Sequence, residues 1–448
     1  MATIIAVIAL LMIVVSLPLI FIKPHWVFYL FLISKVFGAL FYGYIFEAGG
    51  LGTSRTWQPA DFLAIETLIA SFFVRRSENS VNGVLKSFLY IIIVLAALSL
   101  VQGLIFNLSL FALPDIRKLH FIATMLFALK YFIDSKRVDT FLKFTAIILT
   151  VVFIFHLLIR LGYYTPPEAI QRAAGQLAGE RGERAFAPFT YLILLCIGLA
   201  RLGNKMGSKL LSAMMILVAI SGIALAESRT LQGAAVVIGL LSLVFIQGKL
   251  KNIILFSFAA VFLMIAASAI GFDVFARWRS STISEGGIRP DVWRMTEYSA
   301  IAESYAAQPY FLMTGRGIGA VHIIPITTTE EVFQAISYYH SEFLGWLDMF
   351  GIAGLMSILI VWGLSTLQSL KLRFSEMPIL KYYGTIVFLL MPAIFLHSIF
   401  SPSFMNDRGA SLLICFVVII ANCREIYYNL QGDGAVELYQ EGDMQYDH

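Results

Sequence analysis

The chain has few charged residues and few cysteines for its length. Of its 448 residues, 13% are charged and three are cysteines, at Cys196, Cys415 and Cys423. No CxxC spacing or histidine partner accompanies them, so we predict neither a disulfide nor a structural metal. The sequence also lacks the GxxxxGK(S/T) phosphate loop, the GxSxG elbow and the HExxH zinc motif, which argues against the enzyme classes that depend on them.

Apolar residues dominate the composition. They make up 59% of the chain, above the roughly 45–50% of soluble domains, and the net charge of +4 gives no sign of nucleic-acid binding. Because a membrane-spanning helix needs about 20 mainly apolar residues, we predict an all-α polytopic membrane protein with about 12–14 transmembrane helices and a lipid bilayer as its surroundings. The candidate helices cover residues 2–22, 26–46, 57–74, 87–108, 119–134, 141–162, 188–203, 208–226, 231–247, 252–271, 341–366, 380–400 and 409–423.

The first apolar run lacks a basic leader and a cleavage signal, so we expect it to be a retained helix. The chain then divides into helices over 1–271, a large outward loop over 272–340, further helices over 341–423 and a polar cytoplasmic tail over 424–448.

Basic residues in the short loops predict the orientation. One alternating set of loops holds sixteen Lys and Arg residues, and the opposite set holds fourteen, five of them in the segment 272–339. That segment is longer than the about 60 residues over which the positive-inside rule applies, so sixteen should be compared with nine. The first set is therefore predicted to be cytoplasmic.

The outward loops use arginine almost to the exclusion of lysine. They hold thirteen Arg and one Lys, Lys118, whereas the cytoplasmic loops hold ten Lys and six Arg. Guanidinium is the fork-shaped donor that binds phosphate oxygens in a bidentate manner, which favours an anionic, phosphate-bearing ligand outside. The alternative is a simple preference for Lys in cytoplasmic loops.

Two outward residues are candidates for chemistry. Arg229 lies in the tight turn AESRT, where a charge near hydrocarbon indicates function unless it snorkels or pairs with Glu227. His340 lies where the long loop re-enters the membrane, with Gly351 at HX10G spacing, and an imidazole there can accept a proton near neutral pH. The alternative for His340 is a helix cap or interfacial filler.

Other charged residues are expected to be structural. Lys35, Lys130, Asp61 and Glu66 lie in or near spans, so we expect internal pairing, with a substrate path as the alternative. The long loop contains an amphipathic segment, 291–308, predicted to form a helix. Its expected packed residues are Val292, Met295, Ile301 and Ala302, and its expected solvated residues are Arg294, Glu297 and Glu303.

Five short motifs follow one another in the outward connections. They are RAFAPFTY (184–191), ESRT (227–230), GIRPDVW (287–293), TGRGIGA (314–320) and HSEFLGWLDMFGIAGL (340–355). In their order and shared outward placement they resemble the O-antigen ligase and O-antigen polymerase superfamily of bacterial envelopes. The resemblance covers roughly residues 180–360, and the remaining helices agree only in being apolar.

The resemblance implies a GT-C-like helical fold in the bacterial inner membrane, with an active site facing the periplasm and an undecaprenyl-diphosphate-linked glycan as donor. It implies no nucleotide sugar, metal or other cofactor. Carried onto this sequence, Arg229 and Arg289 bind the donor diphosphate, Arg184 is a further candidate for that site, and His340 is the base that activates the acceptor hydroxyl. Ser341 and Glu342 follow His340 where Asn often follows in the family, which leaves the acceptor contacts open.

The predicted function is therefore glycosyl transfer that polymerises O-antigen or exopolysaccharide repeat units, with a chain-length regulator as a possible partner. Polymerisation is favoured because the connection 163–187 carries three further Arg residues, Arg172, Arg181 and Arg184, suited to a second diphosphate. A ligase that attaches the glycan to lipid A core is the alternative. A lipid-linked oligosaccharide flippase is the alternative from another class, and it would usually show two similar halves.

Overall fold

The computed structural model describes most of the membrane helices and part of the long loop. It describes residues 2–37, 58–74, 83–107, 116–163, 189–226, 228–245, 290–320, 322–325, 333–336, 341–401, 403–404 and 409–432, and the structural statements below concern these residues.

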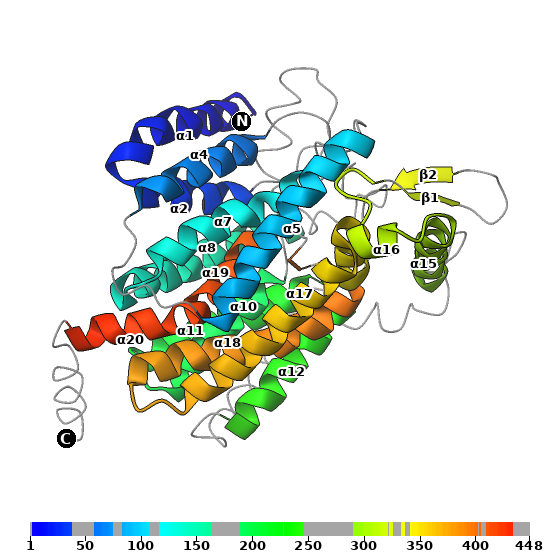
Figure 1. Cartoon of the computed structure of the whole chain (residues 1–448). Helices are drawn as coiled ribbons and strands as arrows, with labels where there is room; N and C mark the ends of the chain where they lie inside the picture. The colour runs from blue at the N-terminus through cyan, green and yellow to red at the C-terminus, as the bar shows by residue number, and fades with distance from the viewer. Residues whose placement is uncertain are drawn as a thin grey trace, which may run out of the picture.

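The described part of the chain is a bundle of helices (Figure 1). Its first half contains α1 (Ala2–Ile22), α2 (Pro24–Val36), α4 (Pro59–Phe73), α5 (Val84–Phe106), η1 (Arg117–Leu119), α7 (His120–Tyr131) and α8 (Ser135–Arg160). Its second half contains α10 (Thr190–Gly203), α11 (Lys209–Leu225), α12 (Arg229–Phe245), α17 (Glu342–Arg373), α18 (Pro378–Phe400), α19 (Ala410–Ala421) and α20 (Cys423–Gly432).

Sequence signals set where several helices begin. Pro24, Pro59 and Pro378 each occupy the first helical turn, where the missing N–H costs nothing. At the start of α4, the Asp61 carboxylate accepts a hydrogen bond of 2.6 Å from the Gln58 backbone N–H, which completes a capping box. At the start of α8, Asp134 accepts from the Lys136 N–H.

The helical polytopic architecture is confirmed. In the described residues, α5, α8, α17 and α18 are long and apolar enough to cross a membrane, and the bent pair α19–α20 is a fifth candidate. The other predicted stretches coincide with shorter helices in the described part, whereas 252–271 lies outside it.

The centre of the bundle is formed by α10, α18 and α19. All residues of α10 from Thr190 to Ala200 are buried, as are those of α19 from Ala410 to Ile420. The outer helices instead expose large apolar side chains, such as Leu98 and Val101 on α5. A helix that is apolar all round and buried, inside others that expose apolar faces, is the arrangement expected when lipid surrounds the bundle.

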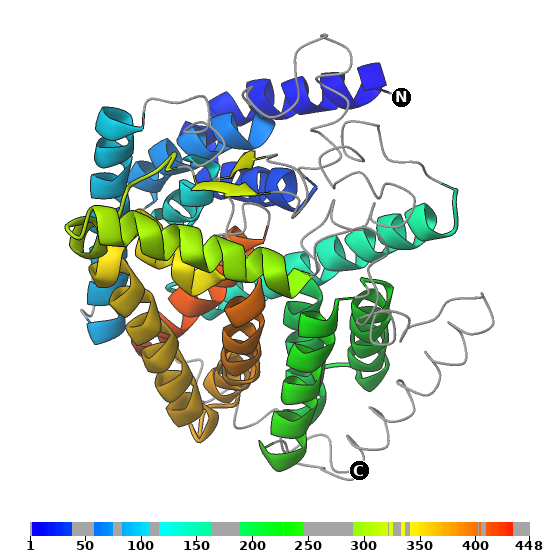
Figure 2. The ribbon, with the colours of Figure 1, turned by 90° about the vertical axis from the view of Figure 1, so that its right-hand side faces the viewer.

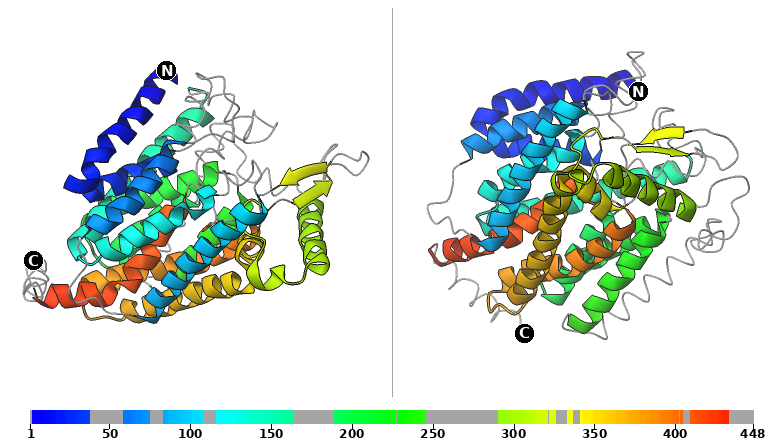
Figure 3. Two further views of the ribbon diagram at one scale, coloured as in Figure 1. Left: turned by 45° about the horizontal axis from the view of Figure 1, so that its top comes forward. Right: turned by 45° about the vertical axis from the view of Figure 1, so that its right-hand side comes forward.

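The long loop between α12 and α17 contains strands as well as helices. It forms α15 (Pro290–Ala307), α16 (Phe311–Thr314) and an antiparallel hairpin of β1 (His322–Pro325) and β2 (Phe333–Ile336), in which His322 pairs with Ile336. Figures 1 and 3 show these elements gathered at one end of the bundle, with α20 at the opposite end. Only the helix over 291–308 was predicted in this loop, and the hairpin was not.

The amphipathic helix predicted over 291–308 is confirmed as α15, but its packed face was partly wrong. Ile301 is buried and Glu303 is exposed, as predicted. Glu297 is fully buried and Ala302 is exposed, against the prediction. The Glu297 error arose because an acidic side chain was assumed to face water, although a partner allows it to face the core. The side chains of Val292, Arg294 and Met295 lie outside the described residues.

The expected internal pairing of charges in the first half is confirmed for Asp61 and Lys35. Glu66 is buried, but its Oε2 has no hydrogen-bond partner among the described residues. The Asp61 carboxylate accepts from the Arg117 guanidinium at 3.0 Å and lies 3.4 Å from His120 Nε2. Lys35 Nζ is 3.1 Å from His120 Nδ1, and all four side chains are buried. Lys130 Nζ donates to the Ser71 carbonyl at 2.9 Å. Asp61, Arg117, His120 and Lys35 therefore satisfy one another inside the bundle.

Candidate functional site

Arg229 is the first residue of α12. Helix α11 ends at Leu225 and α12 begins at Arg229, so the tight turn predicted from AESRT is confirmed. The Arg229 side chain is half-buried, and the hydroxyl oxygens of Ser228 and Thr230 on either side of it are 3.0 Å apart. The guanidinium therefore lies at a helix N-terminus, where the helix dipole adds to its attraction for anions.

The other three predicted site residues, Arg184, Arg289 and His340, lie outside the described residues, as does Glu227. The described chain resumes close to each of them, at Phe189, Pro290 and Ser341. The surroundings of these flanking positions therefore define the framework of the candidate site.

Glu342 fixes the start of α17, two residues after His340. Its side chain is fully buried, and Oε1 accepts a hydrogen bond of 2.6 Å from Trp346 Nε1. Oε2 accepts from the backbone N–H groups of Ser403 and Phe404, the latter at 2.9 Å. The carboxylate thus joins the first turn of α17 to the chain that follows α18.

A polar chain continues from this carboxylate into α18. Ser403 Oγ is 2.9 Å from His397 Nδ1 and accepts a hydrogen bond of 3.0 Å from Ser398 Oγ. The His397 ring in turn packs on Phe189, with ring centroids 5.7 Å apart. The residues that flank His340 and Arg184 in sequence are therefore brought to the same end of the bundle.

The turn at Arg229 belongs to this end as well. Tyr191, in the first turn of α10, packs against Gly222 in the last turns of α11, where an added Cβ would lie 2.7 Å from the tyrosine ring. The α11–α12 turn therefore lies beside the start of α10. Figure 2 shows α15, which begins one residue after Arg289, running across this end of the bundle.

Helix α17 is broken at Gly351, the residue singled out by its HX10G spacing. Gly351 has φ 68° inside the helix, a conformation that favours glycine, and an added Cβ would collide with the backbone carbonyl of Met313. Gly315 has φ 74°, and its added Cβ would lie 2.6 Å from the Gly351 nitrogen. The TGRGIGA turn and the broken helix therefore touch backbone to backbone.

Arg316, in the middle of this turn, pairs with Asp348 of α17. Two parallel hydrogen bonds of 2.8 Å join Nε to Oδ1 and Nη2 to Oδ2, and the Arg316 backbone N–H donates to the Asp348 carbonyl at 2.6 Å. The Asp348 side chain is fully buried and that of Arg316 is 13% exposed. This fork geometry is the strongest form of ion pair available to side chains.

Tyr305 of α15 adds a third contact to this pair. Its hydroxyl donates to Asp348 Oδ1 at 3.3 Å, and burial, with the nearby Asp348 charge, raises the pKa of Tyr305. The phenol therefore stays a neutral donor at physiological pH, and it connects the helix of the long loop to α17.

The C-terminal end of α5 contacts the TGRGIGA turn from the other side. Gln102 Nε2 donates to the Gly315 carbonyl at 2.6 Å, and Asn107 Nδ2 donates to the Arg316 carbonyl at 2.7 Å. Ser99 Oγ donates to the Met349 carbonyl at 2.9 Å, next to Asp348. Two side chains of α5 and that of its C-cap residue Asn107 thus bind the backbones of both motifs.

The structural roles of Glu342, Asp348 and His397 were not predicted from the sequence. Both acids lie in the apolar first turns of α17, where a carboxylate must have a partner. The same rule had been applied to Asp61, so the signal was present in the sequence. Within the described residues, no group of three or more His, Cys, Asp or Glu side chains has a geometry that would hold a metal ion.

No family model matches the chain, and a search of curated proteins finds no significant relative. The resemblance to the O-antigen superfamily therefore stays a prediction that depends on the five motifs.

Proposed function

We propose that the protein transfers glycan from an undecaprenyl-diphosphate-linked donor on the periplasmic face of a bacterial inner membrane, polymerising O-antigen or exopolysaccharide repeat units. One observation carries the proposal. The motifs TGRGIGA and HSEFLGWLDMFGIAGL are joined by the Arg316–Asp348 pair into one framework, at the end of the bundle where Arg229 begins α12.

The chemistry assigns one role to each type of group. The bond between the sugar C1 and the diphosphate oxygen breaks as the acceptor hydroxyl oxygen bonds to C1. Arg229 and Arg289 neutralise the negative charge that grows on the departing diphosphate, and Arg184 supports them. His340 takes the hydroxyl proton and passes it to solvent.

The magnitudes fit this division of labour. Removing one preorganised donor to a developing oxyanion costs about 10²-fold to 10³-fold in rate, and a positioned base contributes about 10²-fold to 10⁴-fold. Preorganisation is the condition for both effects, and the buried Glu342 and Asp348 contacts supply it for the chain that flanks His340.

Purified protein incubated with an undecaprenyl-diphosphate-linked repeat unit tests the proposal. Product length is followed by mass spectrometry, first with donor alone and then with lipid A core added. Longer glycans from donor alone support a polymerase, whereas product only in the presence of core assigns the ligase alternative. His340→Ala is expected to lose about 10²-fold or more of the rate. Arg424→Ala, at an exposed position of α20, serves as the control and keeps full rate.

A flippase is the remaining alternative, and the same preparation separates it. In proteoliposomes a flippase moves the lipid-linked glycan across the bilayer without making a new glycosidic bond. Transport without longer or ligated product would therefore refute the enzymatic proposal.

A further inference from the structure

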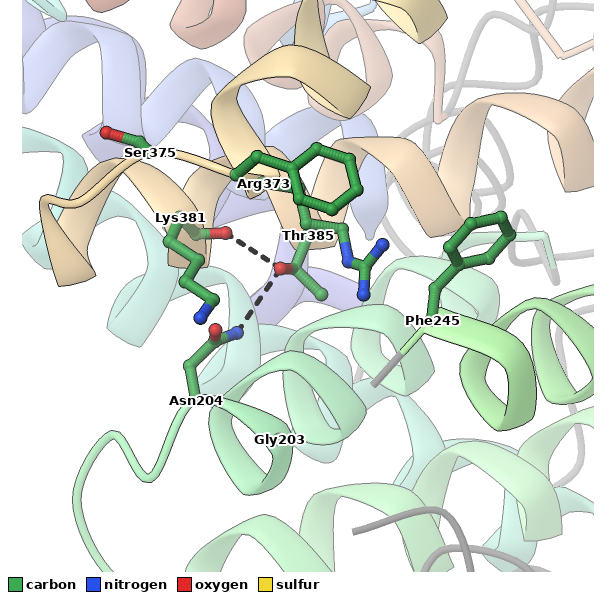
Figure 4. A pocket seen from close by; sticks show the side chains of 8 residues that line it. Gly203, Asn204, Phe245, Arg373, Ser375, Lys381 and Thr385 are labelled. Atoms are coloured by element: carbon green, nitrogen blue, oxygen red, sulfur yellow. Dashed lines mark hydrogen bonds between the residues drawn. The ribbon is translucent and has the colours of Figure 1, made fainter. Parts of the chain in front are cut away.

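A second polar site lies at the opposite ends of α17 and α18 from Glu342. A cavity of about 210 Å³ opens where α17 ends and α18 begins, and the last residues of α10 and α12 complete it (Figure 4). Its lining residues are Gly203, Asn204, Phe245, Arg373, Phe374, Ser375, Lys381 and Thr385. This end carries the loops predicted to be cytoplasmic.

Arg373 is held in the cavity by two aromatic rings. Its guanidinium carbon lies 4.9 Å from the centroid of Phe245 and 5.2 Å from that of Phe374. Nη1 is buried, yet no described residue offers it a hydrogen-bond acceptor. A buried donor of this kind costs free energy unless something accepts from it, so an anion in the cavity would satisfy it.

Lys381, in the first turns of α18, supplies a second cation. The hydroxyl and amide groups around it are already engaged with each other: Thr385 Oγ1 donates to the Lys381 carbonyl at 2.7 Å and lies 3.3 Å from Asn204 Nδ2. Figure 4 shows the Lys381 side chain extending toward Asn204 while the Arg373 guanidinium points toward Phe245. The cationic heads are therefore the groups of this cavity that are suited to a ligand.

No acidic residue lines the described cavity, and Asp139 of α8, which accepts a hydrogen bond of 3.0 Å from the Tyr383 hydroxyl, is not among its lining residues. Between residues 371 and 385 the sequence has one acid, Glu376, which is exposed and does not line the cavity. The cavity also lies at the N-terminus of α18, where the helix dipole favours an anion. Charge, dipole and the buried guanidinium N–H all favour the same kind of ligand.

We propose that this cavity binds a phosphate group, presented either by the head group of an anionic phospholipid or by a soluble phosphate ester. Its volume of about 210 Å³ lies below the about 300–1,000 Å³ of sites for drug-sized ligands, which fits a compact head group. The Arg fork grips the phosphate oxygens and Lys381 adds a point charge. Phe374, 71% exposed at the end of two candidate spans, lies where acyl chains would begin. Basic pockets between membrane helices on the cytoplasmic side bind lipid head groups in this way.

Native mass spectrometry of the full chain in detergent tests the site, with phosphatidylglycerol as the lipid probe and glycerol 3-phosphate as the soluble probe. For Arg373→Gln/Lys381→Gln, phosphatidylglycerol affinity is expected to fall at least about tenfold, because each charge-assisted hydrogen bond is worth that factor or more. Lys371→Gln removes an exposed cation outside the cavity on the same helix and keeps wild-type affinity.

Lys381→Gln alone guards against a folding defect, since the Lys381 ammonium makes no hydrogen bond with the described residues. Its thermal melt without lipid is expected to match wild type while its affinity falls. If glycerol 3-phosphate displaces the lipid with the same dependence on Arg373 and Lys381, the phosphate site stands and its source is soluble. Equal lipid binding by wild type and the double variant, or an equal loss in Lys371→Gln, overturns the proposal.

Discussion

Breaking the Arg316–Asp348 pair is the most direct test of the framework around the candidate site. Arg316→Met leaves the fully buried Asp348 carboxylate without its guanidinium. The Asp348 side chain is 0% exposed and that of Arg316 is 13% exposed, so the pair is a buried ion pair. Loss of one partner from a buried pair costs about 3–5 kcal/mol of stability, whereas a surface pair contributes about 0–1 kcal/mol. We therefore expect Arg316→Met to lose about 3–5 kcal/mol of unfolding free energy.

The double variant Arg316→Met/Asp348→Leu separates stability from positioning. It removes both charges, so it should recover much of the stability lost by either single variant, because apolar residues often replace a buried pair without net cost. Activity should stay low in all three, because the TGRGIGA turn is no longer fixed against α17. The free energies are measured by unfolding in mixed detergent micelles, followed by tryptophan fluorescence.

Lys86→Met provides the matched control. Lys86 Nζ pairs with Glu425 Oε1 at 2.7 Å, with 8% and 3% of the side chains exposed, and it joins α5 to α20. Its loss should destabilise the protein by a similar amount and leave the rate per folded molecule unchanged. Additive losses in the Arg316/Asp348 double variant, or an equal loss of rate in Lys86→Met, would refute the reasoning.

Three further predictions concern single positions. Gly351→Ala should destabilise the fold by more than the about 1–2 kcal/mol that a left-handed backbone costs other residues, because the added Cβ also meets the Met313 carbonyl. Gly363→Ala, at an exposed position of the same helix with open space for a Cβ, should instead stabilise the fold by about 0.5–1 kcal/mol. Thermal melts compare the two variants. Glu342→Gln replaces one hydrogen-bond acceptor with a donor, so it should lower the free energy of unfolding by about 1–3 kcal/mol and lower the transfer rate. If both values are unchanged, Glu342 does not have the role described above. Arg229→Lys should lose nearly as much transfer rate as Arg229→Ala, because bidentate geometry matters more than charge, and wild-type rate in the Lys variant would contradict this.

Periodicity and turn residues predicted the helices well. The predicted apolar stretches matched the helix positions because predicting such a helix needs only local information, namely its length, its hydropathy and a helix-breaking residue at each end. The hairpin β1–β2 was missed because its strands are four residues long and its partner contacts are not local. The number of membrane-spanning helices was also poorly predicted from the sequence. Helices such as α10 are apolar, but they are too short to cross a membrane by themselves.

The site was predictable in part for the same physical reason. Arg229 and Gly351 stand out locally, one as a charge in a tight turn and one as a glycine in a helix, and the structure places them at a helix start and a helix break. The pairing of Arg316 with Asp348 joins residues 32 apart, and composition cannot reveal which of several arginines has a buried acid opposite it. One outward Arg that had been counted toward ligand binding is therefore part of the framework.

The charged side chains at the two ends of α17 differ in whether their hydrogen bonds are satisfied within the protein, and this difference is relevant to function. At the N-terminal end, Glu342 and Asp348 are buried against N–H donors, so these acids hold backbone in place. At the other end, Arg373 is held by aromatic rings and its buried Nη1 has no acceptor among the described residues.

A catalyst that works through preorganised donors needs a rigid frame where bonds change, because reorganisation at that point would raise the barrier. A site that only binds a compact anion can leave its cation open, because the ligand itself completes the hydrogen bonds. The first pattern fits the proposed transfer site, and the second fits the proposed phosphate cavity.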